Sequence, residues 1–142
     1  MFEIKGDAAL KVDAVVENLT AVQTYVEEQL EAASCSMKVM MQVGVAVEEI
    51  FVNIAHYAYG PEGGQVTVDA SVSGDPAVIT IVFKDEGTPY DPLAKEDPDV
   101  TLAAQDRKIG GLGIYMTKKM MDDVAYEYRD GQNILTLKKN LG

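Results

Sequence analysis

Residues 65–84 read QVTVDASVSGDPAVITIVFK and predict the hairpin around which the rest of the fold is arranged. In its first half, apolar side chains occupy every second position: Val66, Val68, Ala70 and Val72. This alternation is typical of a strand with one buried and one solvated face. Gly74-Asp75-Pro76 indicates a turn. Residues 77–84 are apolar enough to form the antiparallel partner strand at the centre of a sheet.

Two helices and a short strand are predicted before this hairpin. Asn18 is a residue type that favours a helix N-cap, and apolar residues follow it at helical spacing to about residue 33: Leu19, Val22, Val26 and Leu30. A second helix is predicted from about residue 37 to about residue 59, with an apolar face of Val43, Val47, Ile50, Phe51 and Ile54. A short strand is expected within residues 2–14, where apolar and polar residues alternate from Leu10 onward.

After the hairpin, residues 85–109 follow no regular pattern and precede a predicted helix from about residue 113 to about residue 121. A second hairpin is predicted from strands at residues 124–128 and 134–138, joined by a turn at Asp130-Gly131. The order strand, two helices, hairpin, loop, helix, hairpin favours an α+β fold. We expect a two-layer sandwich, with helices on one face of a mixed, mostly antiparallel sheet. At 142 residues the chain fits one domain, residues 1–142.

The composition narrows the classes of partner. The formal net charge is −11, whereas proteins that bind nucleic acid or anionic membranes use Lys and Arg to neutralise phosphate. We therefore expect no direct nucleic-acid partner and no membrane. The first residues, MFEIKGDAAL, do not resemble a signal peptide, and Cys35 is the single cysteine, so the expected location is cytoplasmic. A nucleotide ligand stays compatible with this charge if a metal ion and backbone N–H groups bind its phosphates.

The first candidate motif lies on the second predicted helix, where Glu49 and Asn53 are four residues apart. This spacing places both side chains on one helical face, one turn apart. The amide oxygen of Asn53 can bind a hard cation, and the carboxylate of Glu49 is then available as a base. The plain alternative, which is commoner for this pattern alone, is a solvated helix face.

The second candidate motif is Asp85-Glu86-Gly87, directly after the most apolar predicted strand. A carboxylate at the end of a central strand can accept hydrogen bonds from an amino group, such as the exocyclic amine of adenine. Gly87 would let the backbone approach a flat ring closely. The alternative is that the motif forms an ordinary turn.

The third candidate motif is Gly110-Gly111-Leu112-Gly113, immediately before a predicted helix. Glycines at this place leave several backbone N–H groups accessible, and the helix dipole favours an anion there. The alternative is a flexible loop that only starts a helix. The phosphate loop G-x-x-x-x-G-K-[ST] is absent, and no G-x-G-x-x-G follows a predicted strand, so the Walker and Rossmann classes of nucleotide site are excluded.

Taken in order, the three motifs resemble a known ATP-binding fold. E-x-x-x-N on a helix, then D-x-G, then G-x-G opening a helix is similar to the domain shared by gyrase, the heat-shock chaperone and sensor histidine kinases. The small size and the segment EEIFVNIAHYAYG at residues 48–60 resemble the anti-sigma-factor serine/threonine protein kinases of bacteria. The resemblance covers essentially the whole chain and implies the histidine-kinase-like ATPase fold.

The resemblance also implies roles for the matching residues. Asn53 matches the magnesium ligand, Glu49 the group that activates the attacking hydroxyl, and Asp85, with Gly87 beside it, the reader of the adenine amine. The phosphate-binding segment matches four residues: Gly110, Gly111, Leu112 and Gly113.

Three further residues have less definite roles. Arg107 and Lys108 either approach the terminal phosphate or are solvated charges. Thr136, on the last predicted strand, is matched to an adenine-contacting threonine.

The function implied is that of an ATP-binding anti-sigma regulatory factor. It would use Mg²⁺ and phosphorylate a serine or threonine of an anti-anti-sigma-type protein. Members of the family bind that protein or a sigma factor and commonly form homodimers. One departure is Pro89, which occupies the second glycine position of D-x-G-x-G. This departure keeps a second hypothesis open, a non-catalytic module whose binding of a protein partner depends on nucleotide. A third, the isolated ATPase half of a histidine kinase, is disfavoured because no linker or acceptor helix is recognised.

Overall fold

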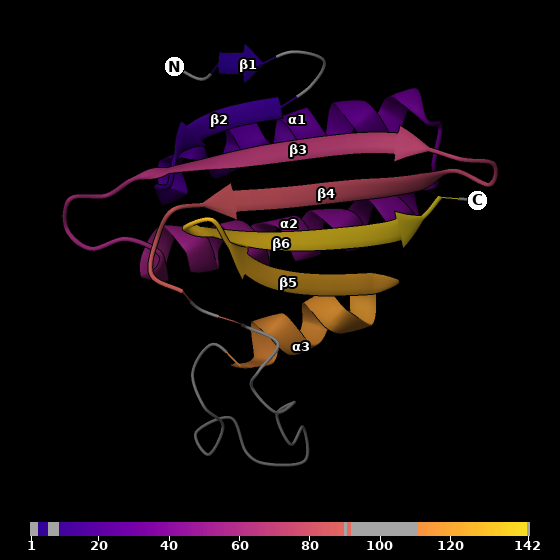
Figure 1. The fold of residues 1–142 in the computed structure, drawn as a ribbon. Helices are drawn as coiled ribbons and strands as arrows, with labels where there is room; N and C mark the ends of the chain where they lie inside the picture. Colours follow the sequence, from indigo (N-terminus) through magenta and orange to yellow (C-terminus); the bar gives the residue numbers. More distant parts are fainter. Residues whose placement is uncertain (1–2, 6–8, 90, 92–110, 142) are drawn as a thin grey trace.

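The computed structural model describes residues 3–5, 9–89, 91 and 111–141. Within these residues the chain forms a six-stranded sheet in the order β1-β2-β3-β4-β6-β5, covered by helices on one face (Figure 1). The strands are β1 (Glu3–Lys5), β2 (Ala9–Asp13), β3 (Gln65–Ser73), β4 (Val78–Asp85), β5 (Asp123–Arg129) and β6 (Gln132–Asn140). The helices are a short 3-10 helix, η1 (Val16–Asn18), then α1 (Leu19–Ala32), α2 (Met37–Tyr57) and α3 (Gly111–Met120).

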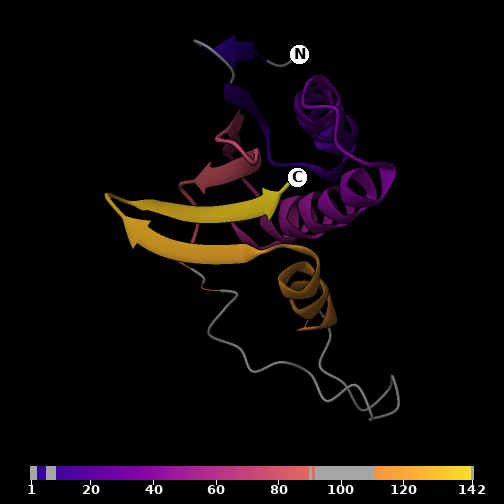
Figure 2. The same ribbon diagram turned by 90° about the vertical axis from the view of Figure 1, so that its right-hand side faces the viewer.

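The predicted α+β two-layer architecture is confirmed. Seen from the side, α1, α2 and α3 lie on the same side of the sheet (Figure 2). Every strand pairing among the described residues is antiparallel, so the parallel component that a mixed sheet allows does not occur in this part of the chain. The hairpin at residues 65–84 is present as β3 and β4, at the centre of the strand order.

The N-terminal region differs from the prediction in two ways. The single strand expected within residues 2–14 is two antiparallel strands, β1 and β2, with Leu10 paired to both Ile4 and Val68. The alternation in the sequence starts only at Leu10, so it carried no signal for β1. Asn18 occupies the N-cap position of α1 but does not cap it, because its amide donates instead to the Asp13 carbonyl oxygen at 2.9 Å.

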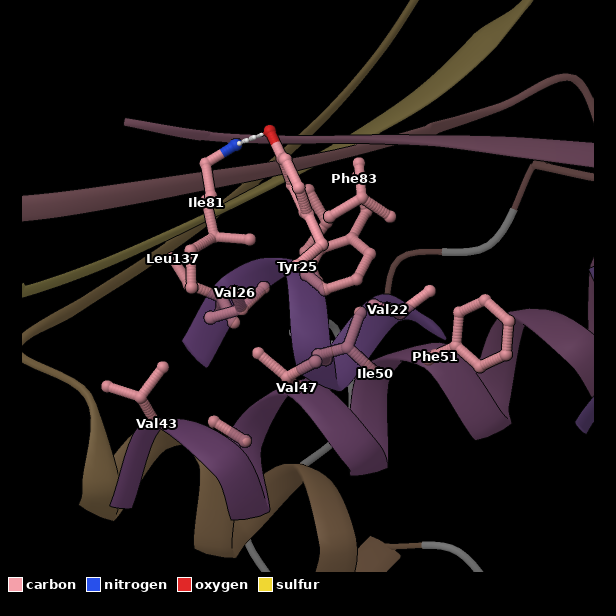
Figure 3. Close-up of a cluster of buried hydrophobic side chains, with 14 of the residues drawn as sticks. Val22, Tyr25, Val26, Val43, Val47, Ile50, Phe51, Ile81, Phe83 and Leu137 are labelled. Carbon is pink, nitrogen blue, oxygen red and sulfur yellow. Dashed lines mark hydrogen bonds between the residues drawn. The ribbon is translucent and has the colours of Figure 1, made fainter. Parts of the chain in front are cut away.

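The hydrophobic core lies between the sheet and the two long helices (Figure 3). Its largest fully buried side chains come from both layers: Leu10, Leu30, Phe51, Ile79, Ile81, Phe83 and Leu137. By length and composition alone α2 could cross a membrane. However, α2 places Val43, Val47 and Phe51 in this core, which is the setting of an ordinary core helix.

Tyr25 connects α1 to the sheet within this core. The Tyr25 hydroxyl accepts a hydrogen bond from the Ala70 N–H on β3 at 3.0 Å, drawn as a dashed line in Figure 3. Ala70 is fully buried, so the hydroxyl satisfies a backbone donor that water does not reach. Burial raises the pKa of the Tyr25 phenol.

Tyr25→Phe is expected to lower the free energy of unfolding by about 1–3 kcal/mol, because it leaves the buried Ala70 N–H without its acceptor. Urea unfolding of the variant and the wild type measures this difference. The control is Tyr128→Phe, at a tyrosine that is 47% exposed, which should change stability by less than about 0.5 kcal/mol. Equal stability of Tyr25→Phe and wild type would contradict this role of the hydroxyl.

Candidate functional site

A pocket opens at the end of the sheet where β4 finishes, between α2, α3 and the β5–β6 hairpin. It contains about 470 Å³ of space outside the atoms, including a part that is open to solvent. Its lining is mostly apolar, with a few polar groups: Ile50, Asn53, Ile54, Tyr57, Ala58, Phe83, Asp85, Thr88, Ile114, Tyr126, Asn133 and Leu135.

Two predicted site residues meet in this pocket, Asn53 from α2 and Asp85 from the end of β4. Asn53 follows Ile50 on the same face of α2, so the helix turns one apolar and one polar side chain toward the pocket. Asn53 is half-buried. The pocket therefore holds an amide at its helical wall and a carboxylate at its sheet wall.

Asp85 is the most buried carboxylate among the described residues, with 5% of its surface exposed. Its Oδ1 accepts two hydrogen bonds, from the Gly87 N–H at 2.9 Å and from Asn133 Nδ2 at 2.9 Å. Within the described part of the chain Oδ2 has no hydrogen bond. A buried carboxylate oxygen in this state favours a ligand that brings a hydrogen-bond donor.

Asn133 is a site residue that the sequence did not reveal. It lies on β6, directly opposite Asp85, and is buried. Its amide nitrogen also donates to the Thr88 carbonyl at 3.0 Å and contacts the Gly87 carbonyl at 3.4 Å. Its amide oxygen accepts a short hydrogen bond from the Tyr126 hydroxyl. A polar residue at a core-facing position of a mostly apolar strand was the one available signal.

The packing of the chain requires glycine at position 87, apart from any close approach to a ligand. A Cβ at this position would overlap the carbonyl group of Ala58, at the C-terminal end of α2. The backbone passes this close because the Thr88 N–H donates to the Ala58 carbonyl at 2.8 Å. Gly87 thus holds the segment after β4 against α2.

Gly87→Ala is expected to lower the free energy of unfolding by about 1–3 kcal/mol, since the new methyl group overlaps backbone atoms that cannot rotate away. The control is Gly60→Ala, where a Cβ meets nothing within 4 Å. Thermal or urea unfolding compares the two. A Gly87→Ala protein as stable as Gly60→Ala would show that the segment moves freely away from α2.

Tyr59 supports the same region from the other side of Asp85. Its hydroxyl donates to the Gln65 carbonyl at 2.6 Å and accepts from the Glu86 N–H at 2.8 Å. Burial raises the pKa of the Tyr59 phenol. The residue after Asp85 is therefore tied to the start of β3.

Glu49 lies one turn before Asn53 on α2 and is half-buried, whereas its neighbour Glu48 is exposed. Glu49 is not among the side chains that line the pocket in the described part of the chain. Glu49 and Asn53 thus lie one turn apart on α2, as expected, and of the two only Asn53 lines the pocket in the described part of the chain.

The glycine segment is described only in part. Helix α3 begins at Gly111, so Gly111, Leu112 and Gly113 form its first turn rather than a loop before it. Ile114, in the next position, lines the pocket, which places the first turn of α3 beside it. Gly110, Arg107 and Lys108 lie outside the described residues.

Thr136 is not brought to the pocket. Side chains alternate along β6, and Asn133, Leu135 and Leu137 face the helices. Thr136 pairs with Val82 on the opposite face of the sheet. Thr136 is therefore not among the described residues that line the pocket, and its adenine contact stays a prediction; the β6 residue beside Asp85 is Asn133.

The residues present fit a Mg-nucleotide. Apolar walls with a buried acceptor suit a flat base that carries an amine, and the first turn of α3 suits phosphate. No group of three or more His, Cys, Asp and Glu side chains that could hold a metal occurs among the described residues. Mg²⁺ commonly takes one or two protein oxygens and completes its shell with phosphate and water, so the single amide oxygen of Asn53 is compatible with it.

Comparisons with known proteins agree with this arrangement. Residues 12–139 match the family described as the histidine kinase-like ATPase domain. The serine-protein kinase RsbW of Listeria monocytogenes is 29% identical over 111 residues, which are 75% of this chain and 69% of that protein. The serine/threonine-protein kinase BtrW of Bordetella bronchiseptica is 26% identical over 102 residues, which are 72% of this chain and 71% of that protein.

A solved structure supports the fold independently. The crystal structure of the RsbU and RsbW domains of a Mycobacterium tuberculosis protein superposes with a TM-score of 0.66 at 17% identity. The match covers 94% of this chain and 32% of that longer one. The resemblance inferred from the three motifs is thus confirmed, and the chain belongs to the family of histidine kinase-like ATPase domains.

Proposed function

We propose that this chain binds Mg-ATP in the pocket and phosphorylates a serine or threonine of an anti-anti-sigma-type protein. The observation that carries the proposal is the buried Asp85 carboxylate, with Oδ1 saturated and Oδ2 left without a hydrogen bond among the described residues, in one pocket with Asn53. Membership of an ATPase domain family and the kinase names of its relatives support it.

The adenine end of the proposed site is the sheet wall. Asp85 Oδ2 would accept a hydrogen bond from the exocyclic amine, and the pocket-lining side chains of Ile50, Ile54 and Ile114 would supply an apolar surface for the ring. Burial strengthens this hydrogen bond, since a carboxylate excluded from water gains more from a donor. Gly87 contributes by keeping the backbone beside Asp85 in place.

The phosphate end is the first turn of α3, with Gly110, Gly111, Leu112 and Gly113 supplying backbone N–H groups. Asn53 binds the magnesium ion, which when bound neutralises phosphate charge. Arg107 and Lys108, outside the described residues, either would approach the terminal phosphate or are solvated charges. Glu49 orients the hydroxyl of the protein substrate and takes up its proton. Positioning and electrostatics supply most of the rate in phosphoryl transfer, so these few groups suffice.

The proposed setting is regulatory. The partner is an anti-anti-sigma-type protein, and a sigma factor is a second binding partner of a homodimeric, cytoplasmic chain. Incubation of the chain with γ-labelled ATP, Mg²⁺ and an anti-anti-sigma-type protein tests the transfer. We expect label on serine or threonine of the partner; its absence in the presence of measured ATP binding would reject the kinase assignment.

Two observations favour a second function. Glu49 lies outside the pocket lining in the described residues, and Pro89 departs from the glycine pattern. A non-catalytic module, in which bound nucleotide sets the affinity for a protein partner, would combine normal Mg-ATP binding with no transfer. The labelling experiment separates the two functions.

A further inference from the structure

We propose that Asn133 is the positioning residue of the nucleotide pocket, holding Asp85 in the orientation that reads the base. This inference rests on the proposed nucleotide binding. It concerns the residue of β6 that is paired with Asp85.

The Asn133 amide nitrogen donates to groups on two segments. Its nitrogen has two N–H donors, and the structure directs them to Asp85 Oδ1 at 2.9 Å and the Thr88 carbonyl at 3.0 Å, with the Gly87 carbonyl further away at 3.4 Å. One side chain therefore bridges β6, the end of β4 and the segment that follows β4. No other described side chain bonds both to Asp85 and to that segment.

The orientation of the Asn133 amide is set by its hydrogen-bond partners. The Tyr126 hydroxyl donates to Asn133 Oδ1, so the amide oxygen is turned toward β5 and the amide nitrogen toward Asp85. A flipped amide would set two oxygens against each other at Asp85 and lose the bond from Tyr126. The orientation is thus fixed from both sides.

Asn133 also helps to set the orientation of the Asp85 carboxylate. Two donors, the Gly87 N–H and the Asn133 amide, occupy Asp85 Oδ1, so the carboxylate plane is set before a ligand arrives. Binding groups that are held in place lose less conformational freedom on binding, which raises affinity. Asn133 acts through Asp85 and needs no contact of its own with the base.

The test is Asn133→Asp, which keeps the shape but replaces the donor with a second carboxylate beside Asp85. Two adjacent carboxyl groups share a proton, and the pKa of one is raised strongly. At pH 8 we expect Mg-ATP affinity about 10–100-fold below wild type, since a charge-assisted bond is replaced by repulsion. At pH 5.5 a protonated side chain can donate again, and the ratio to wild type should fall to about threefold.

Measurement at each pH against the wild type removes effects of pH on the nucleotide. Among the described residues, the titratable side chains that line the pocket besides Asp85 are Tyr57 on α2 and Tyr126 on β5. On the other side of Asp85 lie Tyr59, Lys84 and Glu86. Gln132→Glu adds the same charge one residue away on the other face of β6, and it should show no recovery at low pH.

Each outcome decides the proposal. Recovery of Asn133→Asp on acidification supports it, and a ratio that is near one at pH 8 or independent of pH overturns it. If circular dichroism shows that Asn133→Asp is unfolded at pH 8, Tyr126→Phe replaces it: affinity about 3–10-fold below wild type supports the proposal, and unchanged affinity overturns it. A wild type that binds no nucleotide rejects the proposed function itself, which is a distinct result.

Discussion

Glu49→Gln is expected to lower serine or threonine labelling of the protein partner by about 10²–10⁴-fold, the usual contribution of a general base. Glutamine keeps the size of the side chain and its place on α2, one turn before Asn53, but cannot take up the hydroxyl proton. Labelling rates with saturating γ-labelled Mg-ATP measure the effect. The matched control is Glu48→Gln, which removes the same charge from the exposed neighbour and should retain the wild-type rate.

Glu49→Gln should lower phosphoryl transfer without lowering Mg-ATP binding. Glu49 does not line the pocket in the described part of the chain, so Mg-ATP affinity of Glu49→Gln should stay within about threefold of wild type. Labelling that persists unchanged in Glu49→Gln would reject Glu49 as the base. Lost ATP binding in the same variant would instead place Glu49 in the binding site.

Asp85→Asn is expected to weaken Mg-ATP binding about 100-fold. The asparagine oxygen can keep the bonds from Gly87 and Asn133. An amide nitrogen then stands in place of Oδ2, which we propose accepts the adenine amine. Two donors face each other, and a charge-assisted hydrogen bond is lost. Calorimetric titration with Mg-ATP measures the change.

The control for Asp85→Asn is Asp69→Asn, on the exposed face of β3, which should bind nucleotide like wild type. Because Asp85→Asn preserves the internal bonds of the site, its unfolding midpoint should stay close to that of wild type. If Asp85→Asn bound Mg-ATP with the affinity of wild type, Asp85 would not be the residue that binds the adenine amine.

Much of the fold could be predicted because the elements carry strong periodic patterns. The alternation in β3 and the apolar face of α2 appear in the structure as buried faces, with Val66 and Val68 on one element and Val43 and Val47 on the other. Strand β1 has only three residues and no alternation, so its pairing with β2 depends on tertiary contacts. Asn18 failed as a cap for a similar reason, since its amide finds the Asp13 carbonyl in the folded chain.

Part of the candidate site could be predicted because motifs of particular residues at a fixed spacing indicated it. Asn53 and Asp85 stand out in this way, and they meet in one pocket. Asn133 does not stand out in the sequence, because its proposed role depends on the register that pairs it with Asp85 between β4 and β6. The same register places Thr136 on the other face. A shift of one residue exchanges the two faces of a strand, and the sequence of β6 alone does not determine its register.

The most direct test of the account is calorimetric titration of the wild type and of Asn53→Ala with Mg-ATP and with Mg-ADP. The account predicts that wild type binds Mg-ATP at a single site and that Asn53→Ala loses this binding, because the magnesium ion loses its protein oxygen. Urea unfolding of both proteins checks that the loss is not due to unfolding. A wild-type protein that binds neither nucleotide, or an Asn53→Ala variant with wild-type affinity for Mg-ATP, would contradict it.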